Sequence, residues 1–568
     1  MGGRAVVRAL EDEGVRFAFG IPGTHNIELY DALAESKQVE AVLVTDEQSA
    51  SFCADAVWRA SGQLACVNVV PGAGLTHAMS GIAEAFLDNV PMLVLGCGIR
   101  RDTGRAFQLH DVDQQAMVAP VTKAHVLVEQ GEDLYGSVRR ACRLAREGAP
   151  GPVFVEVPAD FYLFRHEEVA WTAPEASGAD VPDPGSIARA AELLNAADRP
   201  LVYAGLGAAG AAPALLDLVE ALQSPVATTF QGKGVVPESH PLLLWPGFGE
   251  AAPPFAREIA ALCDATLAIG CRFGEVATGS YGVRPPRPLI HADIDVTVIG
   301  RNFETDVALV GDAAAVVPAL LAQLRTRPAD PELRAKILEG RSAVWRDFAP
   351  APGATRVSPW RLLRALQETF GPSTVFTADS GNGTFLAIEM LRLEQPGKFL
   401  APVDYSCMGY AVPAAIGAKL ARPECPVVAL AGDGAFLMTG LELLTASQKG
   451  VAVAVFVLRD RELAQIAQFQ DVAFHRKSAS ELPDYDLEAL CRGLGIECLR
   501  LESDDGISKA LERVAEVTGA GRPVVVDTAI DYSQKTWFTR GVVKTTLHRL
   551  PWPDRLRFLA RAVARRLV

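Results

Sequence analysis

The sequence has no pair of cysteines at the spacing of a metal-binding or redox motif. Its ten cysteines are scattered, none forms a CxxC pair, and several lie inside apolar runs such as LACVNVV. Zinc sites and redox dithiols need closely spaced thiols, and disulfide frameworks are typical of small secreted domains. We therefore expect buried thiols in a reducing compartment, with neither a zinc site nor a disulfide framework.

An excess of positive charge and long apolar runs are also missing. Lys and Arg number 54 against 68 Asp and Glu, a net charge of -14, whereas a general nucleic-acid binder needs clustered cations. No apolar run approaches the roughly 20 residues that span a bilayer. The first residues, MGGRAVVRALEDEG, carry charges where a signal peptide needs an apolar stretch. The sequence therefore predicts a cytoplasmic protein with no nucleic-acid or membrane partner.

Apolar strand patterns alternate with alanine-rich helical patterns in three consecutive stretches of the chain. Runs that are apolar throughout, such as PMLVLG at 91–96 and VAVAVFVL at 451–458, are typical of strands buried on both faces of a parallel sheet. A length of 568 residues also exceeds what one core supports. We expect an α/β protein with three doubly wound parallel-sheet domains in series. Their expected ranges are 1–170, 187–325 and 359–532, with connections at 174–186 and 326–358.

The last segment, 533–568, differs in charge from the rest. It carries nine Lys and Arg against one acid, Asp554, and its apolar residues recur at helical spacing at Leu556, Leu559, Val563 and Leu567. We interpret it as a C-terminal helix that packs its apolar side on the acidic body of the protein. Two alternatives remain open: a helix on a membrane surface, and an active-site lid carrying Trp537 and Phe538.

The most informative stretch runs from 427 to 466. One apolar strand pattern ends in Gly432-Asp433-Gly434, and a second ends in Arg459-Asp460. In a parallel sheet both acids would lie at the carboxyl edge, where ligands bind. Glycines let a phosphate approach the backbone, the following helix offers free N–H groups, and acids provide the oxygen ligands that Mg²⁺ prefers. The pattern predicts a site for a diphosphate and a divalent metal.

This stretch resembles the thiamine-diphosphate enzymes, whose diphosphate motif is GDG followed, one strand later, by NN. The resemblance implies that Asp433, Asp460 and the backbone carbonyl of Glu462 bind the metal, with Asp460 in the place of the second Asn. The chain departs from the motif, because Arg459-Asp460 replaces Asn-Asn. Asp keeps an oxygen ligand, and we expect Arg459 to offset its added charge.

A second match concerns the other end of the cofactor. The family motif His-Glu-Gln corresponds to Asp46-Glu47-Gln48, which implies that Glu47 contacts the aminopyrimidine ring and is the catalytic acid. A carboxyl group on the ring nitrogen promotes the imino form, whose exocyclic nitrogen then removes the thiazolium C2 proton. Met408, in YSCMGYAVPAAIGAKLA, matches the apolar residue that bends the cofactor.

The resemblance implies further contacts from loops at strand ends. It assigns cofactor contacts to Pro22, Thr24, His77, Gln108, Asn382, Gly383, Gly432, Gly434, Ala435 and Leu463, and a substrate pocket to Thr24, His25, Phe107, His110 and Gln465. On residue type alone, each of the three histidines is a satisfied structural residue more often than a proton donor.

The middle stretch is similar to that of the acetohydroxyacid synthase branch. In that branch its strand ends hold FAD, and Arg272 and Asp293 stand where the FAD contacts would be. Other relatives bind ADP or CoA portions there, or nothing. The cofactors implied are therefore thiamine diphosphate and Mg²⁺, with FAD left open.

The overall resemblance is to the acetolactate synthase-like branch. It implies decarboxylation of a 2-oxo acid and transfer of the resulting acyl-anion equivalent to a second carbonyl. The alternatives are a 2-oxo-acid decarboxylase without ligation, a 2-hydroxyacyl-CoA or oxalyl-CoA lyase, and a cofactor-binding scaffold without turnover. In the family one cofactor lies between the first domain of one subunit and the third domain of another, which implies a homodimer or a dimer of dimers.

Overall fold

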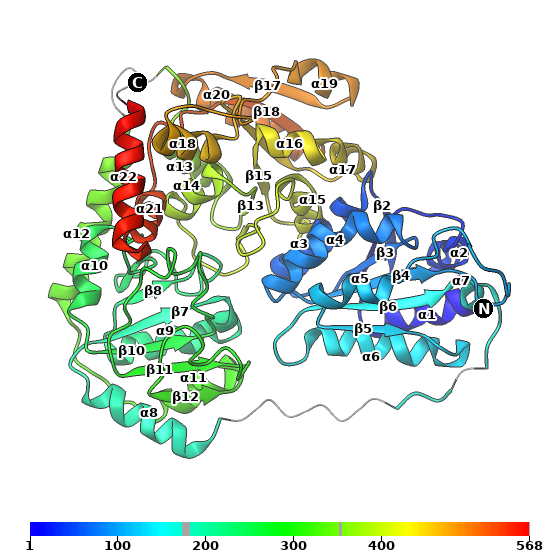
Figure 1. Cartoon of the computed structure of the whole chain (residues 1–568), viewed down its shortest axis with the longest axis horizontal. Helices are drawn as coiled ribbons and strands as arrows, with labels where there is room; N and C mark the ends of the chain where they lie inside the picture. The colour runs from blue at the N-terminus through cyan, green and yellow to red at the C-terminus, as the bar shows by residue number, and fades with distance from the viewer. Residues whose placement is uncertain (168, 173–181, 351–354, 567–568) are drawn as a thin grey trace.

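Three six-stranded sheets follow one another along the chain (Figure 1). The structure is a computed structural model and describes residues 1–167, 169–172, 182–350 and 355–566. All strand pairs within the three sheets are parallel. Parallel neighbours need crossover connections, and helices supply most of them. The predicted α/β fold class is confirmed.

The first block has the strand order β2-β1-β3-β4-β6-β5. Its strands are β1 (Phe17–Gly20), β2 (Glu40–Leu43), β3 (Cys66–Val69), β4 (Met92–Gly98), β5 (Ala124–Leu127) and β6 (Pro152–Pro158). Its helices are α1 (Gly2–Asp12), α2 (Ile27–Glu35), α3 (Glu47–Ser61), α4 (Ala73–Leu87), α5 (Gln114–Val118), α6 (Leu134–Arg146) and α7 (Ala159–Leu163), with 3-10 turns η1 (Ala119–Val121) and η2 (Gly131–Asp133).

The middle block has the order β12-β11-β10-β7-β8-β9, which is the 3-2-1-4-5-6 order of dinucleotide-binding folds when counted from β7. Its strands are β7 (Pro200–Ala204), β8 (Val226–Thr228), β9 (Leu243–Pro246), β10 (Ala265–Ile269), β11 (Leu289–Asp293) and β12 (Val307–Val310). Its helices are α8 (Pro184–Ala196), η3 (Leu206–Ala211), α9 (Ala212–Leu222), α10 (Pro254–Ala261) and α11 (Ala313–Leu321), and α12 (Pro331–Phe348) leads to the third block.

The third block has the order β14-β13-β15-β16-β18-β17, the same relative order as the first block. Its strands are β13 (Val375–Ala378), β14 (Phe399–Leu400), β15 (Val427–Gly432), β16 (Ala454–Arg459), β17 (Glu497–Leu501) and β18 (Val524–Ala529). Its helices are α13 (Pro359–Phe370), α14 (Asn382–Met390), α15 (Ala411–Ala421), α16 (Asp433–Thr439), η4 (Gly440–Glu442), α17 (Leu443–Lys449), α18 (Ala464–Phe474), α19 (Leu487–Gly493), η5 (Asp504–Gly506) and α20 (Ile507–Gly519).

The strand order creates a crevice in both outer blocks. In each, the second strand lies on one side of the first strand and the third strand lies on the other. Loops at the carboxyl ends of β1 and β3, and of β13 and β15, therefore diverge, and ligands of parallel sheets bind at such points. The predicted site residues that follow β1 and β3 therefore lie at one crevice, and those that follow β13 and β15 lie at the other.

The first and third blocks share one apolar core, in which α3 packs along α15. The contact is close because Gly417 has no side chain: a Cβ there would lie 2.2 Å from the carbonyl oxygen of Cys53. All ten cysteines are unpaired thiols. In the part of the chain that the structure describes, no helix is both long and apolar enough to cross a membrane.

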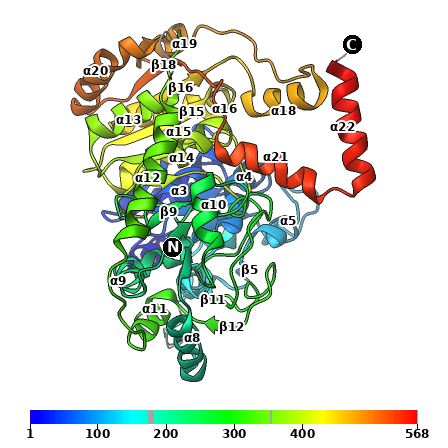
Figure 2. The ribbon, with the colours of Figure 1, turned by 90° about the vertical axis from the view of Figure 1, so that its left-hand side faces the viewer.

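The C-terminal segment forms two helices, α21 (Trp537–Arg549) and α22 (Trp552–Arg566), rather than one. Phe538 is buried, and its ring stacks on Phe385 of the third block with the centroids 4.4 Å apart. Figure 2 shows α22 on the same side of the molecule as α18, which it contacts. Leu556 on α22 is 50% exposed, so the prediction that this helix buries its apolar side is wrong for that residue; Leu567 lies outside the described residues.

Candidate active site

The third block brings two acids together at the carboxyl edge of its sheet. Asp433 begins α16 directly after β15, Asp460 follows β16, and these two strands are neighbours. Asp433 Oδ1 accepts the backbone N–H of Gly434 at 2.9 Å, and Oδ2 accepts that of Arg461 at 2.8 Å. Asp460 Oδ1 accepts the N–H of Glu462 at 3.2 Å. Backbone N–H groups of the chain therefore donate hydrogen bonds to both carboxylates.

The electrostatics of this pair suit a cation. Burial raises the pKa of the Asp460 carboxyl to about 7, and the negative charge of Asp433 acts in the same direction. Burial also raises the pKa of Asp433, while the N–H donors of Arg461 and Gly434 lower it. Two partly buried carboxylates that repel each other are stabilised by a divalent ion, and their oxygens are the ligands that Mg²⁺ prefers. The donor set fits the predicted metal.

Arg459 acts on the acidic pair through Asp433, because its charge lowers the pKa of that carboxyl. Its guanidinium lies 2.8 Å from Asp527 and 3.1 Å from Asp484, so these two acids, and not Asp460, are its ion-pair partners. The cation whose charge lowers the pKa of Asp460 is Arg356. Arg356 precedes the third block in the chain, and its sequence context gave no signal of this contact.

The apolar residues assigned to the cofactor lie around the same edge. A Cβ at Gly434 would lie 2.8 Å from Leu463 and 3.6 Å from the Met408 methyl group, whereas a Cβ at Gly432 would meet no atom within 4 Å. Ala435 is buried on α16. A side chain at 434 would therefore be too close to Leu463, which explains the glycine at this position.

Three further sequence-predicted residues begin helices near this edge. Asn382 and Gly383 are the first residues of α14, and a Cβ at Gly383 would lie 3.1 Å from Leu458 at the end of β16. Gln465 is the second residue of α18. The side chain of Glu462, whose carbonyl was assigned to the metal, pairs with Lys477. We call Asp433, Asp460, Met408 and their neighbours at 382–383, 432–435 and 462–465 the third-block half-site.

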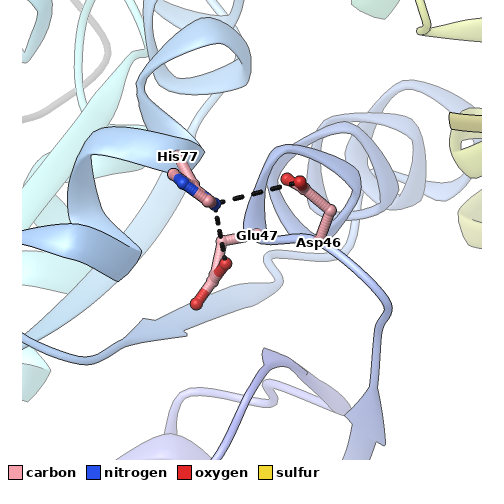
Figure 3. A group of neighbouring side chains, drawn as sticks. All are labelled: Asp46, Glu47 and His77. Atoms are coloured by element: carbon pink, nitrogen blue, oxygen red, sulfur yellow. Dashed lines mark ion pairs between the residues drawn. The ribbon is translucent and has the colours of Figure 1, made fainter. Parts of the chain in front are cut away.

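In the first block, the carboxylate of Glu47 faces an imidazole. Glu47 is the first residue of α3 and is only 7% exposed. The preceding residue, Asp46, caps the helix by accepting the N–H of Gln48 at 2.8 Å. His77 Nδ1 lies 3.5 Å from Glu47 Oε2 and 3.9 Å from Asp46 Oδ2 (Figure 3). A Cβ at Gly74 would lie 2.9 Å from Glu47 Oε1, so a glycine is needed there.

The trio of Asp46, Glu47 and His77 forms the first-block half-site. Its ligand atoms lie within 4.8 Å of one another, so a small cation could also approach it. The sequence match assigned His77 to the cofactor without predicting its contact with Glu47. One acid and one imidazole in direct contact can hold and exchange a proton.

The loops assigned to the substrate pocket are only partly assembled. Pro22 and Thr24 are exposed in the loop after β1. The rings of His25 and His110 lie 5.3 Å apart and nearly perpendicular, and burial, together with the charge of His110, lowers the pKa of His25. By contrast, Phe107, beside the half-buried Gln108, is 100% exposed with φ 60°, so it contacts little of its own chain.

The two half-sites of one chain are not joined directly. Among the described residues, no hydrogen bond or ion pair links Glu47 to Asp433 or Asp460. The blocks are instead fastened by buried groups that the sequence did not predict. Glu442 of the third block accepts hydrogen bonds from Thr45 of the first.

A partly exposed charged contact also joins all three blocks, and it is made by Arg272. Arg272 lies 2.6 Å from Asp404 of the third block and donates to the Leu87 carbonyl of the first. Asp293 accepts the N–H of Asp295, and its buried carboxyl has a raised pKa. The guanidinium that was expected to face FAD thus pairs within the chain through its Nη2 atom, and the assignment of FAD to this block stays a prediction.

Three family models match the chain in sequence. They are described as the N-terminal TPP binding domain of thiamine pyrophosphate enzymes, at residues 1–117, the central domain, at 187–320, and the C-terminal TPP binding domain, at 379–528. Each match contains one of the three sheets or most of it.

Relatives that match over most of their length are acetolactate synthase large subunits, in agreement with the family models. The chain is 32% identical over 555 residues to the probable acetolactate synthase large subunit of Methanocaldococcus jannaschii, covering 93% of this chain and 92% of that protein. It is 32% identical over 556 residues to the acetolactate synthase isozyme 3 large subunit of Escherichia coli K12, covering 94% and 96%. It is 31% identical over 561 residues to the acetolactate synthase large subunit of Corynebacterium glutamicum, covering 94% and 88%.

Proposed function

The chain belongs to the thiamine-diphosphate enzymes, in the branch of the acetolactate synthase large subunits, and from this premise we propose that it decarboxylates a 2-oxo acid and joins the remaining acyl group to a second carbonyl. The observation that carries the proposal is the likeness to acetolactate synthase large subunits over more than nine-tenths of the chain. Glu47, the acid such chemistry needs, is retained and buried.

The third-block half-site would hold the diphosphate and the metal. Asp433, Asp460 and the carbonyl of Glu462 would bind Mg²⁺, and the backbone N–H groups at the start of α16 would face phosphate oxygens, as helix N-termini do. Met408, Leu463, Asn382 and Gly383 would contact the rest of the cofactor. When bound, thiamine diphosphate supplies a carbon nucleophile and accepts the electron pair that remains when CO₂ leaves.

The first-block half-site would hold the proton that starts the reaction. The Glu47 carboxyl is shielded from water, so it would share its proton with a ring nitrogen of the cofactor rather than with solvent. His77 lies beside it, and Pro22, Thr24 and Gln108 would complete the contacts. Thr24, His25, Phe107, His110 and Gln465 would line the substrate pocket, in which the loop carrying Phe107 closes around the substrate.

Completion of the site would come from a second copy of the chain. Glu47 has no hydrogen bond or ion pair to Asp433 or Asp460 within the described residues, and large apolar side chains are exposed next to both half-sites. These are Ile27, Leu43, Leu437, Met438, Leu441 and Leu444. A homodimer that buries them would be the smallest active unit, and a dimer of dimers is compatible with closed symmetry. Ten unpaired thiols, nine of them buried, support a reducing compartment such as the cytoplasm.

Product analysis tests the proposal. The purified chain, with thiamine diphosphate and Mg²⁺, is incubated separately with pyruvate, a panel of 2-oxo acids, a 2-hydroxyacyl-CoA and oxalyl-CoA, and CO₂, aldehydes and coupled products are measured. We expect CO₂ release together with a 2-acyl-2-hydroxy acid. Release of aldehyde without coupling would indicate a simple decarboxylase, cleavage of a 2-hydroxyacyl-CoA or oxalyl-CoA alone would indicate a lyase, and cofactor binding without turnover would indicate a scaffold.

A further inference from the structure

A buried carboxylate of the third block holds Thr45, which lies two positions before the catalytic acid. Glu442, at the end of η4, is 0% exposed. Its carboxylate accepts the Thr45 N–H at 3.2 Å from each oxygen and the Thr45 hydroxyl at 2.7 Å. The Thr445 hydroxyl, with one proton to donate, lies 2.5 Å from the same carboxylate and 3.1 Å from the carbonyl oxygen of Leu43. Glu442 therefore accepts hydrogen bonds from both donors of Thr45, its backbone N–H and its hydroxyl.

Thr45 lies in the turn that sets the direction of α3. β2 ends at Leu43 and α3 begins at Glu47, so only three residues, 44–46, connect the strand to the catalytic acid. Hydrogen bonds from both the backbone and the side chain of Thr45 to one charged acceptor restrict its φ, ψ and χ1 together. The position of the Glu47 carboxyl depends on this turn, because Glu47 is the first residue after it.

Glu442 is also connected through the chain to the predicted metal ligand Asp433. Asp433 begins α16 and Glu442 ends the 3-10 turn that follows it, so one helical segment of ten residues, 433–442, carries the metal-binding acid at one end and the Thr45 acceptor at the other. Burial raises the pKa of Glu442, whereas the hydroxyls of Thr445 and Thr45 lower it. These donors favour the charged carboxylate at this place.

We propose that Glu442 is a positioning residue for the reaction: by holding Thr45, it sets the place of the Glu47 carboxyl against the cofactor. The proposal rests on the proposed function, because it needs Glu47 to act on bound thiamine diphosphate. A merely structural role would make Glu442 a fastener between two blocks, and its loss would then change stability alone. Misplacing a catalytic group by about 1 Å can cost 10²-fold in rate, so the two roles separate in a kinetic measurement.

The variant Glu442→Gln tests the proposal. The amide has no charge and one acceptor oxygen in place of two, which weakens the hold on Thr45 with almost no change in volume. Glu389→Gln is the matched control, because Glu389 is also a buried carboxylate of the third block and accepts two backbone N–H groups, those of Trp537 and Phe538, far from Thr45. Both variants lose a buried acceptor, and only one touches the turn before Glu47.

The measured quantity is the rate of deuterium exchange at C2 of thiamine diphosphate bound to the full chain with Mg²⁺. We expect Glu442→Gln to slow exchange by about 10-fold or more with cofactor affinity within about threefold, and Glu389→Gln to stay within about twofold of wild type. Exchange within twofold of wild type in a folded Glu442→Gln protein would overturn the proposal. If that variant does not fold, Thr45→Val removes the 2.7 Å hydroxyl donor and must slow exchange in its place.

The same experiment separates this inference from the proposed function. If wild type exchanges C2 no faster than free thiamine diphosphate, the proposed function is wrong. The other informative result has two parts: wild type exchanges C2 rapidly, and Glu47→Gln abolishes this exchange whereas Glu442→Gln does not slow it. In that case the proposed function is supported and the positioning role of Glu442 is wrong.

Discussion

The imidazole Nδ1 of His77 lies 3.5 Å from Oε2 of Glu47, so the first-block half-site contains an acid and a base in direct contact. The carboxylate is buried at the start of α3, and the histidine is on the exposed side of α4. This arrangement gives the buried acid one polar neighbour through which a proton can reach solvent.

Glu47→Gln should remove most of the activity and leave the fold intact. The amide has the shape of the carboxyl but cannot give or take the proton, and loss of a general acid–base group costs about 10²-fold or more in kcat/KM. The rate of coupled-product formation and a urea-unfolding curve measure the two effects. Turnover near the wild-type rate would contradict the assignment of Glu47.

His77→Ala should have a smaller effect. We expect a loss in kcat of about 10-fold or less, because the histidine supports Glu47 rather than replacing it. Its side chain is 61% exposed, so the unfolding free energy should change by less than about 0.5 kcal/mol. His125→Ala, on the edge strand β5 of the same sheet, is the control and should leave kcat unchanged. Equal activity of the two variants would exclude a role for His77.

Asp460→Asn should preserve metal binding. The amide keeps an oxygen ligand and removes the charge that Asp433 repels, so Mg²⁺-dependent cofactor affinity should stay within about threefold of wild type or improve. Asp433→Asn should weaken that affinity by about 10-fold or more, since its N–H would face the backbone donors of Gly434 and Arg461. Titration of thiamine diphosphate at several Mg²⁺ concentrations measures both. Loss of folding in Asp460→Asn would instead indicate a structural role.

Glu84 should make stability depend on pH. Burial, and then the charge of Asp88, raises the pKa of the Glu84 carboxyl far above its ordinary 4.5, while Arg59 lowers it. The folded protein therefore keeps this proton at pH values where the unfolded chain has released it, and the unfolding free energy falls as the pH rises above 4.5 toward the raised pKa.

Glu84→Gln cannot ionise and should flatten this fall by about 1 kcal/mol or more between pH 6 and pH 9. Urea unfolding at both pH values measures it. Glu368→Gln, an exposed acid paired with Arg364, is the control and should follow wild type. Parallel behaviour of Glu84→Gln and wild type would show that the proton is not held.

Arg272→Ala should destabilise the protein. Removal of the guanidinium leaves the mostly buried Asp404 without its ion-pair partner, which should lower the unfolding free energy by about 1–3 kcal/mol. Urea unfolding of wild type and Arg272→Ala measures the loss. An unchanged unfolding free energy would contradict the ion-pair role.

The sequence alone determined the fold class and the strands of the sheet centres. Strands such as β4 and β16 are buried on both faces, so their residues are apolar throughout and the pattern is clear. The edge strands β5, β12 and β17 were not predicted, because they are only four or five residues long and partly exposed, so their apolar residues do not form a long buried run. The glycines at the end of a strand were also informative: the motif at 432–434 predicted the sheet edge at which Asp433 and Asp460 lie.

Only the tertiary structure decided which partners the charged residues take. Arg272 of the middle block pairs with Asp404 of the third, and Glu442 of the third block binds Thr45 of the first, 397 positions away in the chain. A strand or a glycine turn is encoded by its own neighbours in sequence, whereas a salt bridge between blocks depends on how those blocks dock. Burial makes such pairs strong and specific, and burial across an interface between blocks exists only after the chain has folded.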